Sequence, residues 1–154
     1  GLREACERRE PGWREALLAH FLERFPHDIP LRWFDGEMAP VFGIDVYGSG
    51  FPRELGYRVY ERGPVRLMVL KLEMLGAIGG EAFRQFMGIE DFAPRRENAA
   101  AAKPQGEIYE EFLSGLVLPE DYLERMYGDR HSRHFYGDAE IRALRGRWGG
   151  ASGG

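Results

Sequence analysis

An apolar run in the middle of the chain limits the folds that the sequence can adopt. Residues Leu67-Met68-Val69-Leu70 lie within a predicted strand at 65–72, and such a run is typical of a strand that is covered on both faces. A strand of this kind needs neighbours along both edges. One good partner precedes it, at 57–60, across a predicted turn. The missing strands are either hidden in ambiguous segments or absent from the chain.

Helical patterns surround the two predicted strands. A helix is predicted at 13–25, where Pro26 ends the apolar stripe, and another at 31–42, where Gly43 is suited to a C-cap. Residues 44–56 are predicted to form a loop because Asp, Ser, Gly and Pro recur there. Further helices are predicted at 79–87, at 108–116, from 119 onward and at 138–148. The pattern indicates an α/β fold that is mostly helical, with two or three strands.

The length of the chain indicates one domain. A chain of 154 residues can bury a sizeable core, and we expect a single domain over 13–148. A charged N-terminal extension at 1–12 and a flexible tail at 149–154 would flank it. Within the domain, the segment at 94–106 lacks apolar periodicity beyond alanine and is predicted to be a mobile loop.

Composition and charge exclude some classes of function. No apolar run approaches the ~20 residues of a membrane-spanning helix. The formal net charge of −4 argues against nucleic-acid binding through a broad basic surface. Cys6 is the single cysteine, so an internal disulfide cannot form and a reducing, cytoplasmic location is expected.

Two charged residues at the end of the apolar strand form the first candidate site. Lys71 and Glu73 alternate with leucines, so both are predicted to point to one side of the strand. They could line a ligand pocket, where burial would perturb their ionisation. The favoured alternative is structural, an ion pair that closes the strand or pairs with nearby arginines, because such networks perturb ionisation too.

Aromatic and acidic residues upstream form a second candidate site. Trp33, Asp35, Asp45 and Tyr47 could line a carbohydrate site, since aromatic faces stack on sugar rings and carboxylates accept hydrogen bonds from hydroxyls. Asp35 or Asp45 could also be a general base that removes the proton of an attacking hydroxyl. Alternatively, both aspartates are helix or turn caps, and Trp33 is predicted to belong to the core.

The segment RHSRHF at 130–135 concentrates basic side chains before a predicted helix. Arginine suits a phosphate because its planar group donates two parallel hydrogen bonds. A solvated basic turn is an equal alternative. His131 and His134 have a spacing that could meet a metal, but no further cluster completes the three or four ligands of a site. No metal site is predicted.

An ordered set of short motifs runs through most of the chain. It comprises FLERFP at 21–26, WFD at 33–35, GIDVY at 43–47, FP at 51–52, GY at 56–57, LKLE at 70–73, FMG at 86–88, LP at 118–119, HFY at 134–136, EI at 140–141 and Trp148. In this order the chain resembles the family “Putative capsular polysaccharide synthesis protein”. That family looks like a bacterial branch of the sulfotransferase-like P-loop fold, and the resemblance covers roughly 13–148.

The resemblance implies a three-layer fold and transfer of a sulfuryl group from 3′-phosphoadenosine 5′-phosphosulfate (PAPS) to a carbohydrate hydroxyl. Members are expected to open with a strand and a Gly-Lys-Val-Gly-Ser type loop for the phosphosulfate, and then an Arg-Asp-Pro type segment. Neither occurs here, because Gly48-Ser49-Gly50 has no lysine and precedes no helix. We therefore expect an incomplete sulfotransferase-like fold, with the donor loop upstream of Gly1 and an inactive isolated chain.

The resemblance also suggests roles for individual residues. The basic segment occupies the place of one that folds over the donor's 3′-phosphate, although it departs from the Gly-x-x-Gly-x-Trp-Lys form. The residues placed there are Arg130, Arg133 and His134, and those placed on the acceptor side are Trp33, Tyr47, Lys71 and Glu73. A function of another class stays open: a non-catalytic binding or scaffold module that uses the surface at 33–47.

Overall fold

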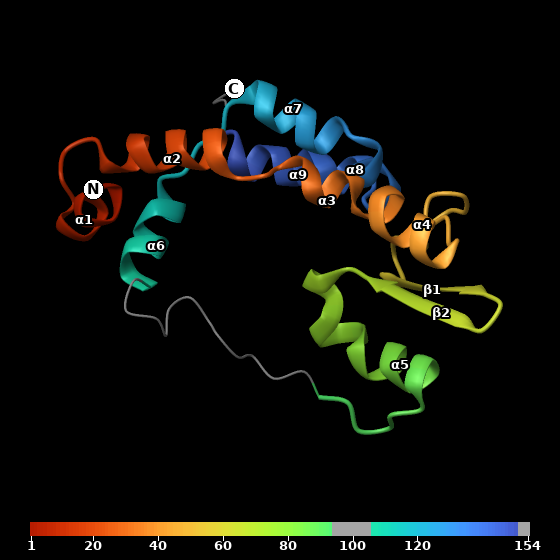
Figure 1. Ribbon diagram of the computed structural model, residues 1–154. Coiled ribbons are helices and arrows are strands. Elements are labelled where there is room, and N and C mark those ends of the chain that lie inside the picture. The colour runs from red at the N-terminus through yellow and green to blue at the C-terminus, as the bar shows by residue number, and fades with distance from the viewer. Residues whose placement is uncertain (94–105, 151–154) are drawn as a thin grey trace. The chain divides into compact units, whose positions relative to one another are not determined.

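The computed structural model describes residues 1–93 and 106–150 (Figure 1). Nearly all of the loop predicted at 94–106 and the end of the predicted tail lie outside the described residues. The chain divides into two compact units, residues 1–27 with 96–117 and residues 28–95 with 118–154. The single domain expected over 13–148 stays a prediction.

The first unit is helical where it is described. Trp13 is buried at the start of its second helix and packs against Phe112, with ring centroids 6.3 Å apart. Glu111 forms ion pairs with both Arg9 and Arg14. The helices are α1 (Leu2–Arg8), α2 (Trp13–Arg24) and α6 (Gly106–Ser114). Helix α2 confirms the prediction at 13–25.

The second unit begins with a nearly continuous helical segment. It consists of α3 (Asp28–Trp33), the π-helical turn η1 (Phe34–Met38) and α4 (Ala39–Phe42). Gly43 ends it with φ 65°, a left-handed conformation that glycine adopts without strain. The predicted helix is therefore confirmed, although it begins earlier and contains a π turn. The prediction that Trp33 belongs to the core is wrong, since 43% of its surface is exposed.

The irregular segment after Gly43 supplies much of the hydrophobic core. Its backbone turns at Asp45, whose Oδ1 accepts hydrogen bonds of 3.0 Å from the amides of Tyr47 and Gly48. This turn directs apolar residues inward from a segment that the sequence correctly predicts to be a loop. The core residues are Phe34, Ile44, Val46, Phe51, Tyr60 and Phe135.

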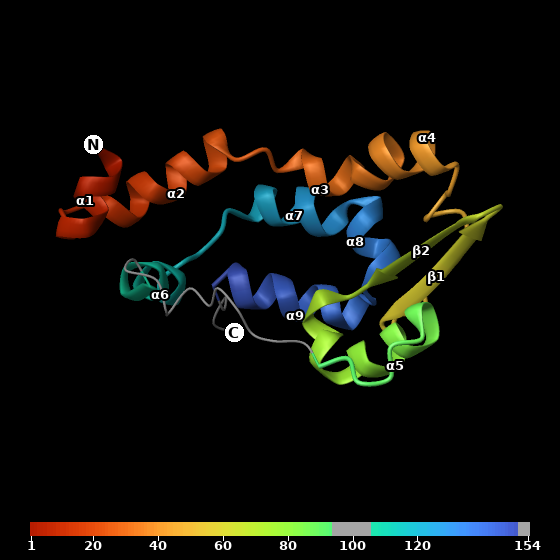
Figure 2. The ribbon, with the colours of Figure 1, turned by 60° about the horizontal axis from the view of Figure 1, so that its bottom comes forward.

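Two strands form an antiparallel hairpin, seen side by side in Figure 2. Strand β1 (Tyr57–Arg62) pairs with β2 (Val65–Leu70), which confirms the predicted hairpin. Within the described residues the sheet has only these strands, so the α/β class and the helical majority are confirmed. The three-layer sulfotransferase-like arrangement stays a prediction.

The predicted strand at 65–72 is too long. The Lys71 amide donates to the Gly56 carbonyl (2.8 Å), and the Met74 amide then donates to the Lys71 carbonyl (3.0 Å). The second bond closes the 3₁₀ turn η2 (Leu72–Met74). The strand therefore ends before Lys71, and η2 leads directly into α5 (Leu75–Met87).

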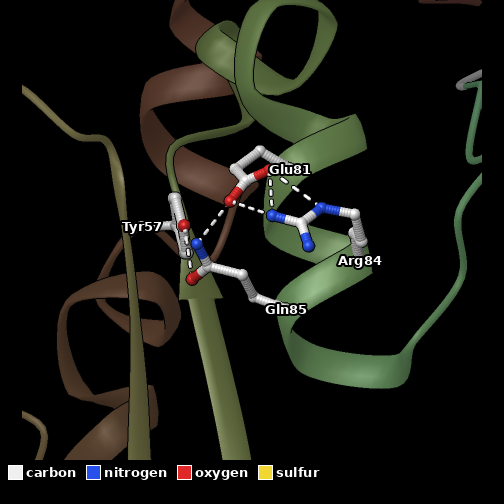
Figure 3. A network of polar contacts seen from close by, with 4 residues as sticks. All are labelled: Tyr57, Glu81, Arg84 and Gln85. Atoms are coloured by element: carbon white, nitrogen blue, oxygen red, sulfur yellow. Dashed lines mark hydrogen bonds and ion pairs between the residues drawn. The ribbon is translucent and has the colours of Figure 1, made fainter.

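Helix α5 is tied to β1 by a polar network (Figure 3). The buried Tyr57 hydroxyl donates to Gln85 Oε1 (2.9 Å), and Gln85 Nε2 donates to Glu81 Oε1 (2.5 Å). Arg84 also pairs with Glu81 (2.7 Å). The Arg84 hydrogen bond, followed by that of Gln85, lowers the pKa of Glu81.

Replacing Gln85 with alanine should lower the free energy of unfolding by about 1–2 kcal/mol, because the buried Tyr57 hydroxyl loses its acceptor. Urea denaturation followed by circular dichroism measures the change. In the Tyr57→Phe background, Gln85→Ala should lower the free energy of unfolding by a much smaller amount. Equal costs in the two backgrounds would contradict the role of this hydrogen bond.

Three helices complete the described part of the second unit. They are α7 (Glu120–Gly128), α8 (Arg130–Phe135) and α9 (Asp138–Trp148). Helix α9 matches its predicted bounds, and α7 begins one residue later than predicted, with Pro119 as its N-cap. The basic segment was expected to precede a helix; instead it forms α8, because Asp129 caps its first turn by accepting from the His131 amide (2.8 Å).

Candidate functional site

Helix α8 brings together residues that are far apart in the sequence. Arg130 forms an ion pair with Asp35 of the π turn. The same guanidinium lies 4.1 Å from the centre of the Tyr47 ring, within the range of a cation–π contact. Three predicted site residues therefore meet. With His131 they form the Arg130 cluster (Asp35, Tyr47, Arg130 and His131).

His131 is the most constrained member of this cluster. Its Nδ1 lies 3.0 Å from the Tyr47 hydroxyl. Its ring stacks on Phe34 (centroids 5.9 Å apart, planes at 17°) and meets the Phe135 ring edge-on at 4.9 Å. Within the described part of the chain, Nε2 has no hydrogen-bond partner. The sequence places His131 in the basic segment and at a metal-like spacing from His134, but no local pattern indicates its contacts with Tyr47 and the aromatic rings.

Burial sets the protonation of the Tyr47–His131 pair. Burial, followed by the nearby Asp35 carboxylate, raises the pKa of Tyr47 to about 12. Burial likewise lowers the pKa of His131, since a low-dielectric environment disfavours the charged imidazolium. Both groups are therefore neutral near pH 7. A neutral histidine with a free ring nitrogen can accept a proton from a ligand.

A pocket of about 240 Å³ lies beside His131. Its aromatic walls are Phe34, Phe135 and Tyr136, and its polar groups are Lys71, Glu73 and His131. We call it the Lys71 pocket. It is mostly apolar with a few polar groups, which is the usual composition of a small-molecule site.

Lys71 is a buried cation in the wall of this pocket. Its side chain is 3% exposed, and Nζ lies 2.5 Å from Glu140 Oε1 and 4.6 Å from the centre of the Tyr136 ring. The prediction that Lys71 and Glu73 share one side of a strand is wrong, because Glu73 lies in the turn η2. Burial, followed by a hydrogen bond with Glu73, raises the pKa of Tyr136.

Arg133 and His134, predicted to contact phosphate, lie in the last turn of α8. The carbonyls of both accept hydrogen bonds from Arg53, with Nε 3.2 Å from the His134 oxygen. His134 and residues 50–55 line an open pocket of about 660 Å³, the His134 pocket. Burial, followed by Arg53 and Arg130, lowers the pKa of His134. Arg53 is a basic residue of this pocket for which the sequence showed no signal.

The remaining predicted residues have separate environments. The Asp45 carboxylate is occupied by the two backbone amides of its turn. Trp33 contacts Phe34 edge-on, with centroids 5.5 Å apart, and keeps an accessible face. The structure therefore brings Asp35, Tyr47 and Arg130 into direct contact but gives Asp45 a local structural role.

Two further properties concern the described residues alone. Within 1–93 and 106–150, no group of three or more His, Cys, Asp or Glu side chains is arranged to hold a metal ion. No helix in that part of the chain combines the length and apolar character needed to cross a membrane.

One comparison with known proteins gives a match. A family model described as “Putative capsular polysaccharide synthesis protein” matches residues 18–137. This range includes all residues of the Arg130 cluster and those that line the Lys71 pocket. No curated protein and no solved structure matches the chain.

Proposed function

Because the chain belongs to the family “Putative capsular polysaccharide synthesis protein”, we propose that it supplies the acceptor side of a sulfotransferase-like enzyme. In capsular polysaccharide synthesis, this enzyme would transfer a sulfuryl group from PAPS to a carbohydrate hydroxyl. The family description supports the role in polysaccharide synthesis. The sulfuryl chemistry is what the likeness of that family to the sulfotransferase-like fold implies.

The observation that carries the proposal is the position of His131. Tyr47 contacts one ring nitrogen, and His131 lines the Lys71 pocket; among the described residues its other ring nitrogen has no hydrogen-bond partner. Apolar walls with a few polar anchors suit a sugar, whose ring has both apolar faces and hydroxyl groups. A hydroxyl in this pocket would lie beside a neutral imidazole.

Transfer of a sulfuryl group in line requires orientation of the hydroxyl, removal of its proton and stabilisation of developing charge. Of the candidate bases, Asp35 is ion-paired with Arg130 and Asp45 accepts two amide hydrogen bonds. Their lone pairs are therefore partly occupied. His131 is the better-placed base if its Nδ1–H donates to the Tyr47 oxygen, which leaves Nε2 as the acceptor.

The donor side is proposed to involve basic groups on and near α8. Arg130, Arg133 and His134 are the residues that the resemblance places at the 3′-phosphate. Arg53, which lines the His134 pocket, adds a fourth basic group to this region. Guanidinium groups suit a phosphate because they donate paired, charge-assisted hydrogen bonds.

Adenosine 3′,5′-bisphosphate, the product left by PAPS, should raise the melting temperature of the protein expressed from its whole reading frame. Arg130→Ala combined with Arg133→Ala should raise the dissociation constant of this nucleotide roughly tenfold or more. A hydrogen bond to a charged group contributes about 1.5–3 kcal/mol, and the double substitution removes such bonds. Thermal melts across a nucleotide series measure the change. Arg84→Ala, which removes an exposed arginine paired with Glu81, is the control. An absent shift in the unmodified protein would contradict the donor site.

A second candidate function is a non-catalytic binding module. The observation that favours it is a set of exposed apolar residues on α3 and α4, namely Ile29, Trp33, Val41 and Phe42. Exposed apolar patches often mark interaction surfaces. Such a module would bind its partner through Trp33 and would show no stabilisation by the nucleotide.

A further inference from the structure

The Lys71 pocket has the size of a site for one sugar ring. Its volume of about 240 Å³ is below the roughly 300–1,000 Å³ of pockets that hold drug-sized ligands. The rings of Phe34, Phe135 and Tyr136 provide flat apolar surfaces for the faces of such a ring. One unit of a polysaccharide therefore fits better than several.

The charge of the pocket wall comes from three groups. The Lys71 ammonium is compensated by Glu140, which lies 2.5 Å away. Among the described residues Glu73 has no ion-pair partner, and it lies close enough to Tyr136 to help raise the pKa of that phenol. His131 is neutral near pH 7 because burial lowers its pKa. Within the described part of the chain, Glu73 is therefore the acidic group of the wall without an ion-pair partner.

The charged residues around the Lys71 pocket do not supply a cation for Glu73 among the described residues. Near Tyr136, Glu73 and Glu140 are acidic groups that raise its pKa, and the Lys71 ammonium lies 4.6 Å from the centre of its ring. Arg53 acts on Glu140 more weakly than Lys71 does, and it lines the other pocket. Glu140 lies outside the lining and pairs with Lys71, so among the described residues Glu73 is the acidic group of the lining that has no ion-pair partner.

We infer that the Lys71 pocket selects an amino sugar whose free ammonium group pairs with Glu73. The sugar ring would lie against the aromatic walls, and Lys71 Nζ, which has donors beyond the one used by Glu140, would donate to a sugar hydroxyl. A uronic acid would bring its carboxylate toward Glu73 and be repelled. This specificity rests on the carbohydrate acceptor of the proposed function and names its chemical class.

Binding of three related monosaccharides tests this specificity. Glucosamine as its ammonium form, N-acetylglucosamine and glucuronate are cationic, neutral and anionic, and amide chemical shifts of the labelled chain report their dissociation constants. Glucosamine should bind about threefold to fivefold more tightly than N-acetylglucosamine, the size expected for one exposed ion pair. Glucuronate should bind more weakly than both.

Two variants connect the preference to Glu73. Glu73→Gln should remove the preference for glucosamine, because glutamine has a similar shape but no charge, so the dissociation constants of glucosamine and N-acetylglucosamine should become alike. Glu54→Gln removes an acidic group that lines the His134 pocket and should leave the preference intact.

Three results would overturn the inference: equal affinities for the three sugars, tightest binding of glucuronate, or no binding of any sugar at the Lys71 pocket. The nucleotide-dependent melting shift described above is an independent measurement. If that shift persists while the sugar preference is absent, the specificity is wrong and the donor site of the proposed function stands.

Discussion

Replacing Glu140 with alanine should lower the free energy of unfolding by roughly 2–3 kcal/mol. Removal of one partner of a buried ion pair costs about 3–5 kcal/mol because the other charge stays buried and unpaired. Lys71 meets this condition with a 3% exposed side chain, but Glu140 is 46% exposed, and solvent screening reduces the effect. Glu140 Oε2 also accepts from the Gly137 amide (2.9 Å) at the start of α9, so alanine removes that cap as well.

A double-mutant cycle separates the two contributions. Glu140→Gln retains an acceptor for the Gly137 amide and removes the charge that faces Lys71. Lys71→Met in the Glu140→Gln background should recover most of the lost stability, because an apolar side chain then replaces the unpaired ammonium. Urea denaturation followed by circular dichroism measures all four proteins. Additive effects of the two substitutions would contradict a structural ion pair between Lys71 and Glu140.

Acidification below about pH 6.5, the ordinary pKa of histidine, should destabilise the protein. Burial lowers the folded-state pKa of both His131 and His134. As the pH falls below 6.5, each histidine binds a proton in the unfolded chain before it can bind one in the folded chain. The free energy of unfolding then falls by up to about 1.4 kcal/mol per pH unit for each histidine. The loss ends once the pH is below the lowered folded-state pKa.

The contribution of His131 to this slope can be measured directly. His131→Phe keeps an aromatic ring between Phe34 and Phe135 but cannot be protonated, so the loss of stability between pH 6.5 and pH 5 should become smaller. Adding His134→Phe should reduce it further. A slope that is the same in both variants and the unmodified protein would show that neither histidine is buried in its neutral form.

A separate loss of stability is expected at lower pH. A hydrogen bond from the Gly137 amide, followed by the Lys71 ammonium, lowers the pKa of Glu140. The stability contributed by this carboxylate is present above its unfolded pKa and is lost as the pH falls through its lowered value. The two windows are distinct, since the histidines titrate in the unfolded chain near 6.5 and glutamate near 4.3.

The helices and the hairpin could largely be predicted because their signals are local. Apolar spacing and Pro26 indicate α2, Gly43 ends α4 at the expected residue, and α9 has its predicted bounds. The errors occur where distant contacts compete with local preference. Trp33 is large and mostly apolar, as core residues usually are, but it lies on the exposed side of its helix.

Contacts within the candidate site were the least predictable part. Asp35 and Arg130 were placed in different candidate sites, and they form an ion pair across 95 positions of the sequence. The sequence groups Lys71 with Glu73, but the ion-pair partner of Lys71 is Glu140, 69 positions away. No spacing rule connects such pairs, because their distance depends on how the π turn, the hairpin and the last helices pack.

Most of the helices, the hairpin, the loop after Gly43 and the residues available to build a site follow from the sequence alone. These features depend on side-chain periodicity and on backbone preferences of glycine and proline, which act over a few residues. Three features come from packing: β2 stops before Lys71, Asp129 caps the basic segment as a helix, and His131 belongs both to the Arg130 cluster and to the wall of the Lys71 pocket. The physical reason is that burial and ion pairing depend on neighbours in space, which only the packing of the chain supplies.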